Sequence, residues 1–352
     1  MSENKSETTA SNNPLGMLGF DFVEFTSPDA AWLDTLFRAF GFSRTMQSTC
    51  GRMDLHHQND IRMVVNRRDD DESAQFRAAH GPAIGAMGWR VQDPQHAHDE
   101  AVRRGATSAM DRTRAFEMPA ILGIGDSLIY FVGPKDAGGG LFERTMVAHP
   151  EPFHQPDAGF VRIDHLTNNV YKGTMHKWAD FYKDVFGFTE VRYFDIRGEK
   201  TGLTSYALRS PDGSFCIPIN EGSESTSQID EYLREYQGPG VQHLAFLTVD
   251  LLSSLDRMEG GPIQTLDIDD EYYGGVFDRV PGVREDPARI QHHNVLVDGD
   301  DEGYLLQIFT KNVVGPIFIE LIQRENHHSF GEGNFGALFR SIERDQERRG
   351  VL

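Results

Sequence analysis

Three residues in the second half of the chain combine metal-binding chemistry with apolar surroundings. Glu320 lies in the run "PIFIELIQ", and His165 and His243 lie in "RIDHLTNNV" and "GVQHLAFLTV". All three runs have the composition and patterning of buried strands. A carboxylate in such a strand is strongly destabilising unless something neutralises it. We therefore expect Glu320 to have a positively charged partner.

The two histidines and Glu320 together offer the ligands of a single divalent cation. The three residues are separated by 78 and 77 positions, which predicts three different strands. Any one of them alone is more simply explained as a core residue with its hydrogen bonds satisfied. The metal-site interpretation therefore depends on all three occurring together. Two imidazoles and one carboxylate form the facial triad typical of non-haem Fe(II), which leaves positions open for substrate and dioxygen. Catalytic zinc also uses this ligand set and is the alternative.

The elements that must position these residues occur twice in the sequence. Matching segments follow in the same order: 19–44 with 162–190, 86–93 with 243–250, 125–134 with 302–311, and 141–144 with 318–321. The first pair predicts a strand and then an amphipathic helix that stops at "FGF", where Gly41 and Gly187 suit left-handed caps. The sequence thus predicts two copies of one strand–helix–strands plan.

The polar triad belongs to the second copy only. In the alignment of the copies His165 corresponds to Phe22, and His243 to Ala86. Glu320 corresponds to Glu143, but the first copy has no histidines at the two other positions. We expect the first copy to bind no metal. We place the boundary in the proline-rich segment 149–159, which gives domains 16–150 and 151–352.

Composition limits the class of protein. Of 352 residues, 39% are hydrophobic, and the formal charge of −20 argues against nucleic acid or an anionic membrane as partner. Two cysteines exclude a disulfide framework or a thiolate-rich metal site. No apolar run is long enough to span a bilayer. Residues 1–15 are polar and predict a disordered leader, and we expect a cytoplasmic protein.

The motifs "IDHLTNNV", "GVQHLAFLT", "EGYLLQIFTK", "PIFIELIQR" and "FGEGNFGALFRSIERDQERRG" resemble the 4-hydroxyphenylpyruvate dioxygenase family. The resemblance runs from about Gly16 to the last residue. It implies an α+β fold of two tandem vicinal-oxygen-chelate domains, each of paired βαβββ modules that form an open, barrel-like mixed sheet with outer helices. It also implies one Fe(II) per chain and conversion of 4-hydroxyphenylpyruvate and O₂ to homogentisate and CO₂ in tyrosine and phenylalanine catabolism. A homo-oligomer, dimer or tetramer, is expected.

The resemblance also assigns the site residues. His165, His243 and Glu320 fall on the metal positions. Phe309 and Phe335 sandwich the substrate ring, Phe318 packs near the iron, and Gln307, Phe309 and Phe335 act in catalysis. The polar positions around the substrate are Ser205, Asn220, Gln228, Gln242, Gln307 and Asn334. Strand alternation would point Gln242 away from His243. Asn334 also suits a helix cap, and the glycines before it favour a hinged lid helix over 334–350.

Three alternatives remain open from the sequence. 4-Hydroxymandelate synthase uses the same substrate, metal and fold but hydroxylates the benzylic carbon. "PIN" (218–220) and Phe335 match the homogentisate-forming family better. A metal-free protein that binds an aromatic ligand on the same scaffold would have no need for three convergent donors. A ring-cleaving extradiol dioxygenase would be expected to show a histidine–tyrosine acid–base pair, which we do not identify.

Overall fold

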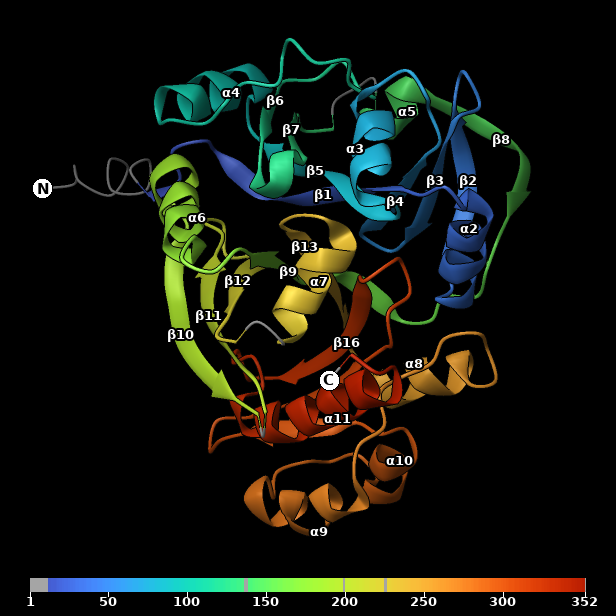
Figure 1. Ribbon diagram of the computed structural model, residues 1–352. Coiled ribbons are helices and arrows are strands. Elements are labelled where there is room, and N and C mark those ends of the chain that lie inside the picture. The colour runs from blue at the N-terminus through green and yellow to red at the C-terminus, as the bar shows by residue number, and fades with distance from the viewer. Residues whose placement is uncertain (1–11, 136–138, 199, 225–226, 352) are drawn as a thin grey trace, which may run out of the picture.

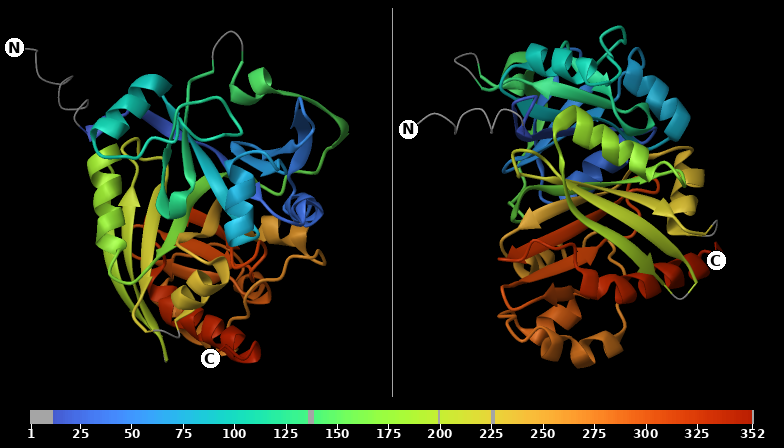
Figure 2. Two further views of the ribbon diagram at one scale, coloured as in Figure 1. Left: turned by 45° about the horizontal axis from the view of Figure 1, so that its top comes forward. Right: turned by 90° about the vertical axis from the view of Figure 1, so that its left-hand side faces the viewer.

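The computed structural model describes residues 12–135, 139–198, 200–224 and 227–351. Two eight-stranded mixed sheets follow one another along the chain, and helices lie outside each (Figures 1 and 2). The predicted α+β class and curled, helix-covered sheets are therefore confirmed. Most of the predicted leader, residues 1–11, lies outside the described residues.

The first sheet is built from residues 17–153. Its strands are β1 (Met17–Thr26), β2 (Ser43–Ser48), β3 (Met53–Gln58), β4 (Ile61–Asn66), β5 (Ala83–Val91), β6 (Ala120–Leu122), β7 (Leu128–Val132) and β8 (Met146–Phe153). Their order is β6-β7-β5-β1-β4-β3-β2-β8, with β1–β4 and β5–β7 parallel. The helical elements are α2 (Ala30–Ala39), α3 (Glu72–His80), α4 (Pro94–Arg103), η1 (Ile124–Asp126) and α5 (Leu141–Thr145).

The second sheet is built from residues 160–325. Its strands are β9 (Phe160–Val170), β10 (Thr189–Arg197), β11 (Gly202–Arg209), β12 (Cys216–Gly222), β13 (Gly240–Thr248), β14 (Leu296–Gly299), β15 (Tyr304–Phe309) and β16 (Phe318–Glu325). Their order is β10-β11-β12-β9-β13-β16-β15-β14, with β12–β9 and β13–β16 parallel. The helical elements are α6 (Met175–Phe181), η2 (Tyr182–Phe186), α7 (Gln228–Tyr236), α8 (Leu251–Met258), α9 (Asp270–Arg279), α10 (Pro287–His292), η3 (Glu332–Asn334) and α11 (Phe335–Arg348).

The repeat extends to the ends of the first helices and to the contact between the halves. Gly41 and Gly187 follow α2 and η2 in the left-handed conformation, as predicted. Trp89 of the first half packs edge-on against Phe186 of the second, with ring centroids 4.7 Å apart. Its counterpart Phe246 packs against Phe40 of the first half at 5.8 Å. Each half therefore covers the other with the end of its "FGF" helix.

The last part of the repeat alignment is wrong, and the sheet register shows why. Glu143, the expected counterpart of Glu320, lies on α5 and pairs with Lys135 at the surface. The strand equivalent to β16 is β7. β16 pairs in parallel with β13, and β7 pairs in parallel with β5, which is the counterpart of β13. Tyr130 lies opposite Gly88, as Glu320 lies opposite Ala245. Tyr130 is therefore the counterpart of Glu320.

Aromatic side chains fill the interior of the first sheet where the second has polar ones. Phe22 contacts Phe116, Tyr130 and Phe142 at centroid distances of 5.4, 5.9 and 5.7 Å. All four side chains are buried in one apolar cluster. Within the described residues, the only grouped set of potential metal ligands lies in the second half.

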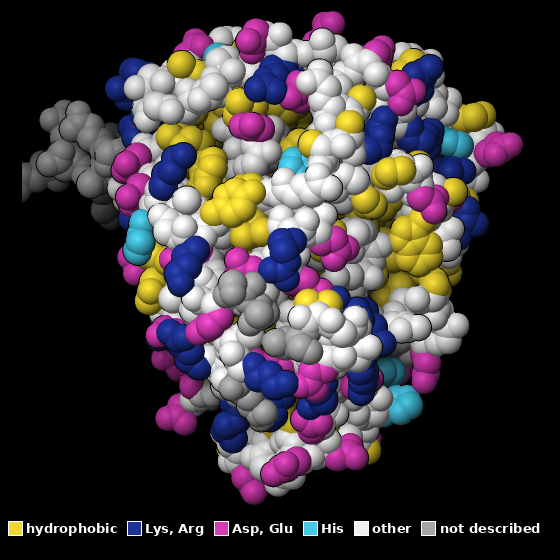
Figure 3. Space-filling view, viewed as in Figure 1, with side chains coloured by type: hydrophobic (Ala, Val, Ile, Leu, Met, Phe, Trp, Pro, Cys, Tyr) yellow, Lys and Arg dark blue, Asp and Glu magenta, His cyan; other side chains and the backbone are white. Residues whose placement is uncertain are grey.

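The outside of the molecule carries charges of both signs. On the face in Figure 3 acidic and basic side chains are interspersed. None of the helices in the described part of the chain is long and apolar enough to cross a membrane. The segment in which we place the domain boundary begins within β8, and the boundary itself stays a prediction.

Candidate active site

The three predicted metal ligands lie on neighbouring strands in the middle of the second sheet. His165 is on β9, His243 on β13 and Glu320 on β16. Ala245 of β13 lies opposite both His165 and Glu320, so these two flank the central strand at the same level. His243 is two residues away on that strand, on the same face. Pairing of the strands thus brings together residues that are far apart in the sequence.

The donor atoms of this triad converge. Nε2 of His165 lies 3.0 Å from Oε2 of Glu320, and Nε2 of His243 lies 3.5 Å from the same oxygen. Donors at adjacent corners of a metal with bonds of ~2.1 Å stand about 3 Å apart, so these distances suit one shared ion. Nδ1 of His165 meets Asp164 at 2.8 Å, and Nδ1 of His243 meets Gln242 at 3.1 Å. Both Nε2 atoms are thereby left facing Glu320.

Burial and charge shift the pKa values of the triad. Burial alone would lower the pKa of His165, but the carboxylates of Glu320 and Asp164 outweigh it and raise this pKa to about 9. Burial would raise the pKa of Glu320, but His165 and hydrogen bonds from both histidines lower it to about 2. Burial lowers the pKa of His243 despite Glu320. Glu320 is therefore a carboxylate at neutral pH, and its surroundings favour a cation.

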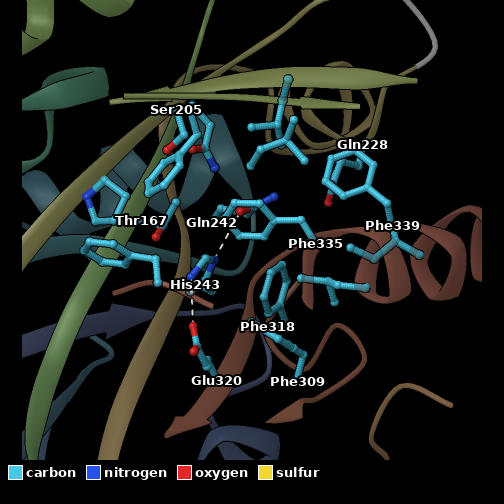
Figure 4. Close-up of a pocket in the computed structure, with 18 of the residues that line it drawn as sticks. Thr167, Ser205, Gln228, Gln242, His243, Phe309, Phe318, Glu320, Phe335 and Phe339 are labelled. Carbon is cyan, nitrogen blue, oxygen red and sulfur yellow. Dashed lines mark hydrogen bonds and ion pairs between the residues drawn. The ribbon is translucent and has the colours of Figure 1, made fainter. Parts of the chain in front are cut away.

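A cavity opens from the triad between the sheet and α11. Its walls are largely aromatic, and Figure 4 shows Phe335 and Phe339 projecting into it from α11. The cavity brings together all the predicted site residues except Asn334: His165, Ser205, Asn220, Gln228, Gln242, His243, Gln307, Phe309, Phe318, Glu320 and Phe335. Its apolar lining with a few convergent polar groups suits a small aromatic ligand.

Polar side chains gather at the end of the cavity away from the triad, where Figure 4 places Ser205. Ser205 lies opposite Asn220 across β11 and β12, and Asn220 lies opposite Asn169 of β9. Gln228 enters from the first turn of α7. Nearer the triad, Gln307 of β15 lies opposite Ile322, two residues beyond Glu320 on β16, and its buried side-chain oxygen has no hydrogen-bond partner within the described residues. These neutral groups can orient a ligand through hydrogen bonds.

The expected orientation of Gln242 is wrong. The register of β13 against β9 passes from Val241 opposite Asn168 to His243 opposite Thr167, which leaves Gln242 without a partner. Such a bulge interrupts strand alternation, so consecutive side chains can lie on the same side. Gln242 therefore lines the cavity beside His243.

Asn334 does not line the cavity. It is fully buried, and its side-chain oxygen accepts hydrogen bonds from Tyr272 Oη at 2.7 Å and Arg279 Nη2 at 3.3 Å. It makes no side-chain cap, so that prediction is wrong. Asn334 fastens the start of α11 to α9 instead. Its expected role in substrate binding has no contact to support it.

Comparison with known proteins identifies the family. Residues 11–144 match a profile described as "Hydroxyphenylpyruvate dioxygenase, HPPD, N-terminal", and residues 162–307 match the "Glyoxalase/Bleomycin resistance protein/Dioxygenase superfamily". A relative named 4-hydroxyphenylpyruvate dioxygenase from Legionella pneumophila subsp. pneumophila is 41% identical, covering 97% of this chain and 98% of its own. The chain belongs to the 4-hydroxyphenylpyruvate dioxygenase family. It is thus an enzyme, a dioxygenase.

Two further similar proteins carry names other than 4-hydroxyphenylpyruvate dioxygenase. "Protein MelA" of Shewanella colwelliana is 58% identical and covers 97% of this chain and 99% of its own. A solved mutant of 4-hydroxymandelate synthase from Streptomyces coelicolor has a TM-score of 0.79 at 24% identity, covering 94% of this chain and 99% of its own. At that identity the likeness concerns the fold. The family's fold is therefore shared by enzymes with different names.

Several residues around this dioxygenase family site were not predicted from the sequence. Thr167, Phe194, Ile196, Leu203 and Phe330 also line the cavity. Their positions in the sequence are those of ordinary core residues, so no local signal singles them out. Arg324 is another unpredicted residue, whose guanidinium holds the Asp164 carboxylate beside His165. Its place between Gln323 and Glu325 gives it the pattern of a solvated strand end.

Proposed function

We propose that this enzyme converts 4-hydroxyphenylpyruvate and O₂ to homogentisate and CO₂, as a step of tyrosine catabolism. The observation that carries the proposal is a buried carboxylate–two-histidine group at one end of an aromatic cavity that has neutral polar groups at the other. A ligand with a metal-chelating 2-oxo acid and a phenol at opposite ends matches both. The names of the relatives support the same reaction.

One Fe(II) is proposed to be held by Nε2 of His165, Nε2 of His243 and the carboxylate of Glu320. These donors fit, since all three atoms lie within 4.8 Å of one another and Glu320 is otherwise a buried charge. When bound, the ion supplies a chelation site for the 2-oxo acid and the redox chemistry of dioxygen. The two histidines and one carboxylate leave coordination positions free for both reactants.

The aromatic side chains are proposed to fix the substrate ring over the reacting centre. Phe318 stacks on His243, with centroids 4.7 Å apart and planes at 19°, so it forms the wall nearest the metal ligands. Phe309 lies opposite Glu320 on the next strand and packs on Phe318. Phe335 approaches from α11 and contacts Phe194 at 5.4 Å. A ring held between Phe309 and Phe335 would present one carbon to attack.

The neutral polar groups are proposed to orient both ends of the substrate. Ser205, Asn220 and Gln228 can exchange hydrogen bonds with a phenol without imposing a charge that would ionise it. Gln242 and Gln307 lie nearer the triad and can donate to the oxo acid. The buried oxygen of Gln307 is free to accept a hydrogen bond at this wall.

Helix α11 is proposed to act as the lid that excludes water. Leu338, Phe339 and Ile342 close the cavity on one side. The carboxylate of Glu343 accepts hydrogen bonds from the backbone N–H groups of Lys200 and Thr201. The apolar stripe of the helix thus covers the cavity, while its polar face is fastened to the rim. A closed cavity keeps reactive oxygen species from solvent.

The test loads the protein anaerobically with Fe(II) and then measures its oxygen consumption with 4-hydroxyphenylpyruvate. The product is then identified. Homogentisate is the expected product, and 4-hydroxymandelate would overturn the reaction in favour of the synthase. Failure to take up iron or oxygen would favour a metal-free binding protein. Glu320→Gln, which removes the charged ligand with little change in shape, serves as the negative control. Light scattering on the same sample tests the expectation of a dimer or tetramer.

A further inference from the structure

Arg324 is a buried cation that the proposed reaction does not use. It lies near the end of β16, four residues beyond Glu320, and its side chain is only 12% exposed. Nε donates to Oδ1 of Asp164 at 3.0 Å, and Nη2 donates to Oδ2 at 2.8 Å. This is a two-pronged arginine–carboxylate pair, the geometry that best fixes a carboxylate in place.

The carboxylate held by Arg324 is the one that contacts His165. Nδ1 of His165 lies 2.8 Å from Oδ2 of Asp164. Because that carboxylate accepts from Arg324 at both oxygens, it acts toward the ring as an acceptor, and Nδ1 carries the hydrogen. When a cation takes the place of the Nε2–H hydrogen bond to Glu320, Nε2 of the neutral ring presents its lone pair to that cation. Asp164 has no partner on β13, since the register passes from His165 directly to Ile163, and this bulge brings the two side chains together.

The third nitrogen of Arg324 reaches the loop before α11. Nη1 donates to the carbonyl oxygen of Ser329 at 2.6 Å and to that of His327 at 3.2 Å. Phe330, the next residue, stands edge-on to His165 with centroids 5.5 Å apart. The loop held by Arg324 thus places an aromatic wall against the same imidazole.

We propose that Asp164 and Arg324 are positioning residues for the metal site: Asp164 fixes the tautomer and orientation of His165, and Arg324 fixes Asp164 and joins it to the lid's entry loop. The proposal rests on the proposed ligand role of His165. Carboxylates behind a ligating histidine raise its basicity and hold its ring, and their loss weakens metal binding by roughly 10- to 100-fold.

Asp164→Asn is the decisive variant. Oδ1 of Asp164 accepts from Arg324 Nε, and Oδ2 accepts from Arg324 Nη2 and meets His165 Nδ1. An asparagine keeps one of these two acceptors and turns its NH₂ toward the donors of the other. Where the NH₂ faces His165, the imidazole must move its hydrogen to Nε2, the proposed ligating atom, which blocks metal binding until it moves back. Where the NH₂ faces Arg324 Nε instead, His165 keeps an acceptor but loses the carboxylate charge that raises its basicity. We expect the Kd for Co(II), measured by titration of its visible absorption, to rise about 10- to 100-fold.

Asp21→Asn is the matched control. Asp21 occupies the same position on β1, directly before Phe22 where the second half has His165, and pairs with Arg90 at 3.8 Å. It is buried to a similar degree but has no imidazole to orient. Its variant should bind Co(II) like the wild type. An Asp164→Asn protein that folds normally and keeps the wild-type Kd would overturn the proposal.

Arg324→Met tests the connection to the loop. Amide hydrogen exchange over residues 327–334 should accelerate in this variant and much less in Asp164→Asn, which keeps Arg324. Equal exchange in wild type and Arg324→Met would overturn the loop connection. If the unpaired Asp164 prevents folding, the double variant Asp164→Asn/Arg324→Met removes both charges and serves in its place.

The same titration separates the proposal from the proposed function. If wild-type protein and Glu320→Gln bind Co(II) equally weakly, the triad is not a metal site and both ideas fail. If Glu320→Gln loses Co(II) binding but Asp164→Asn does not, the triad holds the metal and only the positioning role of Asp164 is refuted.

Discussion

Each histidine of the proposed metal site is held by the residue directly before it. Asp164 meets Nδ1 of His165, and Gln242 meets Nδ1 of His243, and both contacts arise because the preceding residue has no partner across β9 and β13. A bulge is needed in each case, since a regular strand would turn the two side chains to opposite faces. The dipeptides "DH" and "QH" thus each supply a proposed metal ligand and the residue that holds it.

Removal of a ligand should abolish metal retention. Each of the variants His243→Ala and Glu320→Ala keeps only two of the three donors. His243→Ala also removes one of the partners of the buried Glu320 carboxylate. We expect loss of turnover together with loss of bound iron, measured by elemental analysis after desalting. His56→Ala is the control, because His56 is a fully buried histidine of the first half that pairs with Asp34. A Glu320→Ala protein with normal iron content would refute the ligand assignment.

Loss of the Phe335 ring should change the product more than the rate of substrate binding. Phe335→Ile removes the ring that faces the cavity from α11 while keeping its apolar character. We expect part of the product to shift to benzylic or uncoupled oxidation, because side chains around a shared intermediate decide its fate. Chromatography of the products measures the ratio. An unchanged product ratio at a normal rate would count against a positioning role for Phe335.

At the scale of elements, α11 depends on the turn that introduces it. Gly331 is in the left-handed conformation at φ +79°, and a Cβ there would lie 2.3 Å from the side-chain oxygen of Gln307. The turn that leads into α11 is therefore fitted against a residue of the cavity wall. The helix is also fastened along its length, for instance by Ser341, whose hydroxyl donates to the carbonyl of Asp267 at 2.7 Å.

Gly331→Ala should disturb both the turn and the wall. The left-handed conformation costs an alanine roughly 1–2 kcal/mol, and the added methyl must also displace the Gln307 amide. We expect lower thermal stability and a raised KM for 4-hydroxyphenylpyruvate. Gly350→Ala is the control, since Gly350 has φ +71° but open space around its Cβ position. Equal KM values in the two variants would argue that Gly331 supports the backbone alone.

At the scale of the whole molecule, the contact between the halves follows the internal repeat. Trp89 and Phe246 occupy corresponding positions, and each packs against the "FGF" end of the other half's helix. Truncation of a large buried aromatic side chain costs about 3–5 kcal/mol. Trp89→Ala should lower the free energy of unfolding by this amount, as measured by chemical denaturation. The candidate active site lies outside this contact, so iron uptake by the folded variant should be normal.

A buried acid in the first half predicts a pH-dependent stability. Burial raises the pKa of Glu24 to about 7, above the ordinary value of 4.5. Its stability contribution is therefore complete below pH 4.5, falls as the pH rises through 7, and leaves a penalty of about 3 kcal/mol at higher pH. Glu24→Gln should raise Tm at pH 8 and change it little at pH 5. A gain of equal size at both pH values would show that ionisation of Glu24 is not the cause.

Much of this arrangement could be predicted from the sequence. The convergent triad followed from one buried carboxylate and two histidines in apolar strands, and the repeat followed from matching helix ends. The counterpart of Glu320 was misassigned because similar strand sequences do not encode which neighbour each strand joins. Gln242 and Asn334 were misplaced because a bulge and a long-range contact to Arg279 depend on tertiary structure.

The aromatic filling of the first sheet has a consequence for protein engineering. Phe22, Ala86 and Tyr130 stand at the positions that correspond to the two histidines and the glutamate. Restoring polar residues at these three places would not by itself create a second reaction centre, because Phe116 and Phe142 already occupy the interior. Smaller side chains would first have to replace these two, and the first half would be less stable as a result.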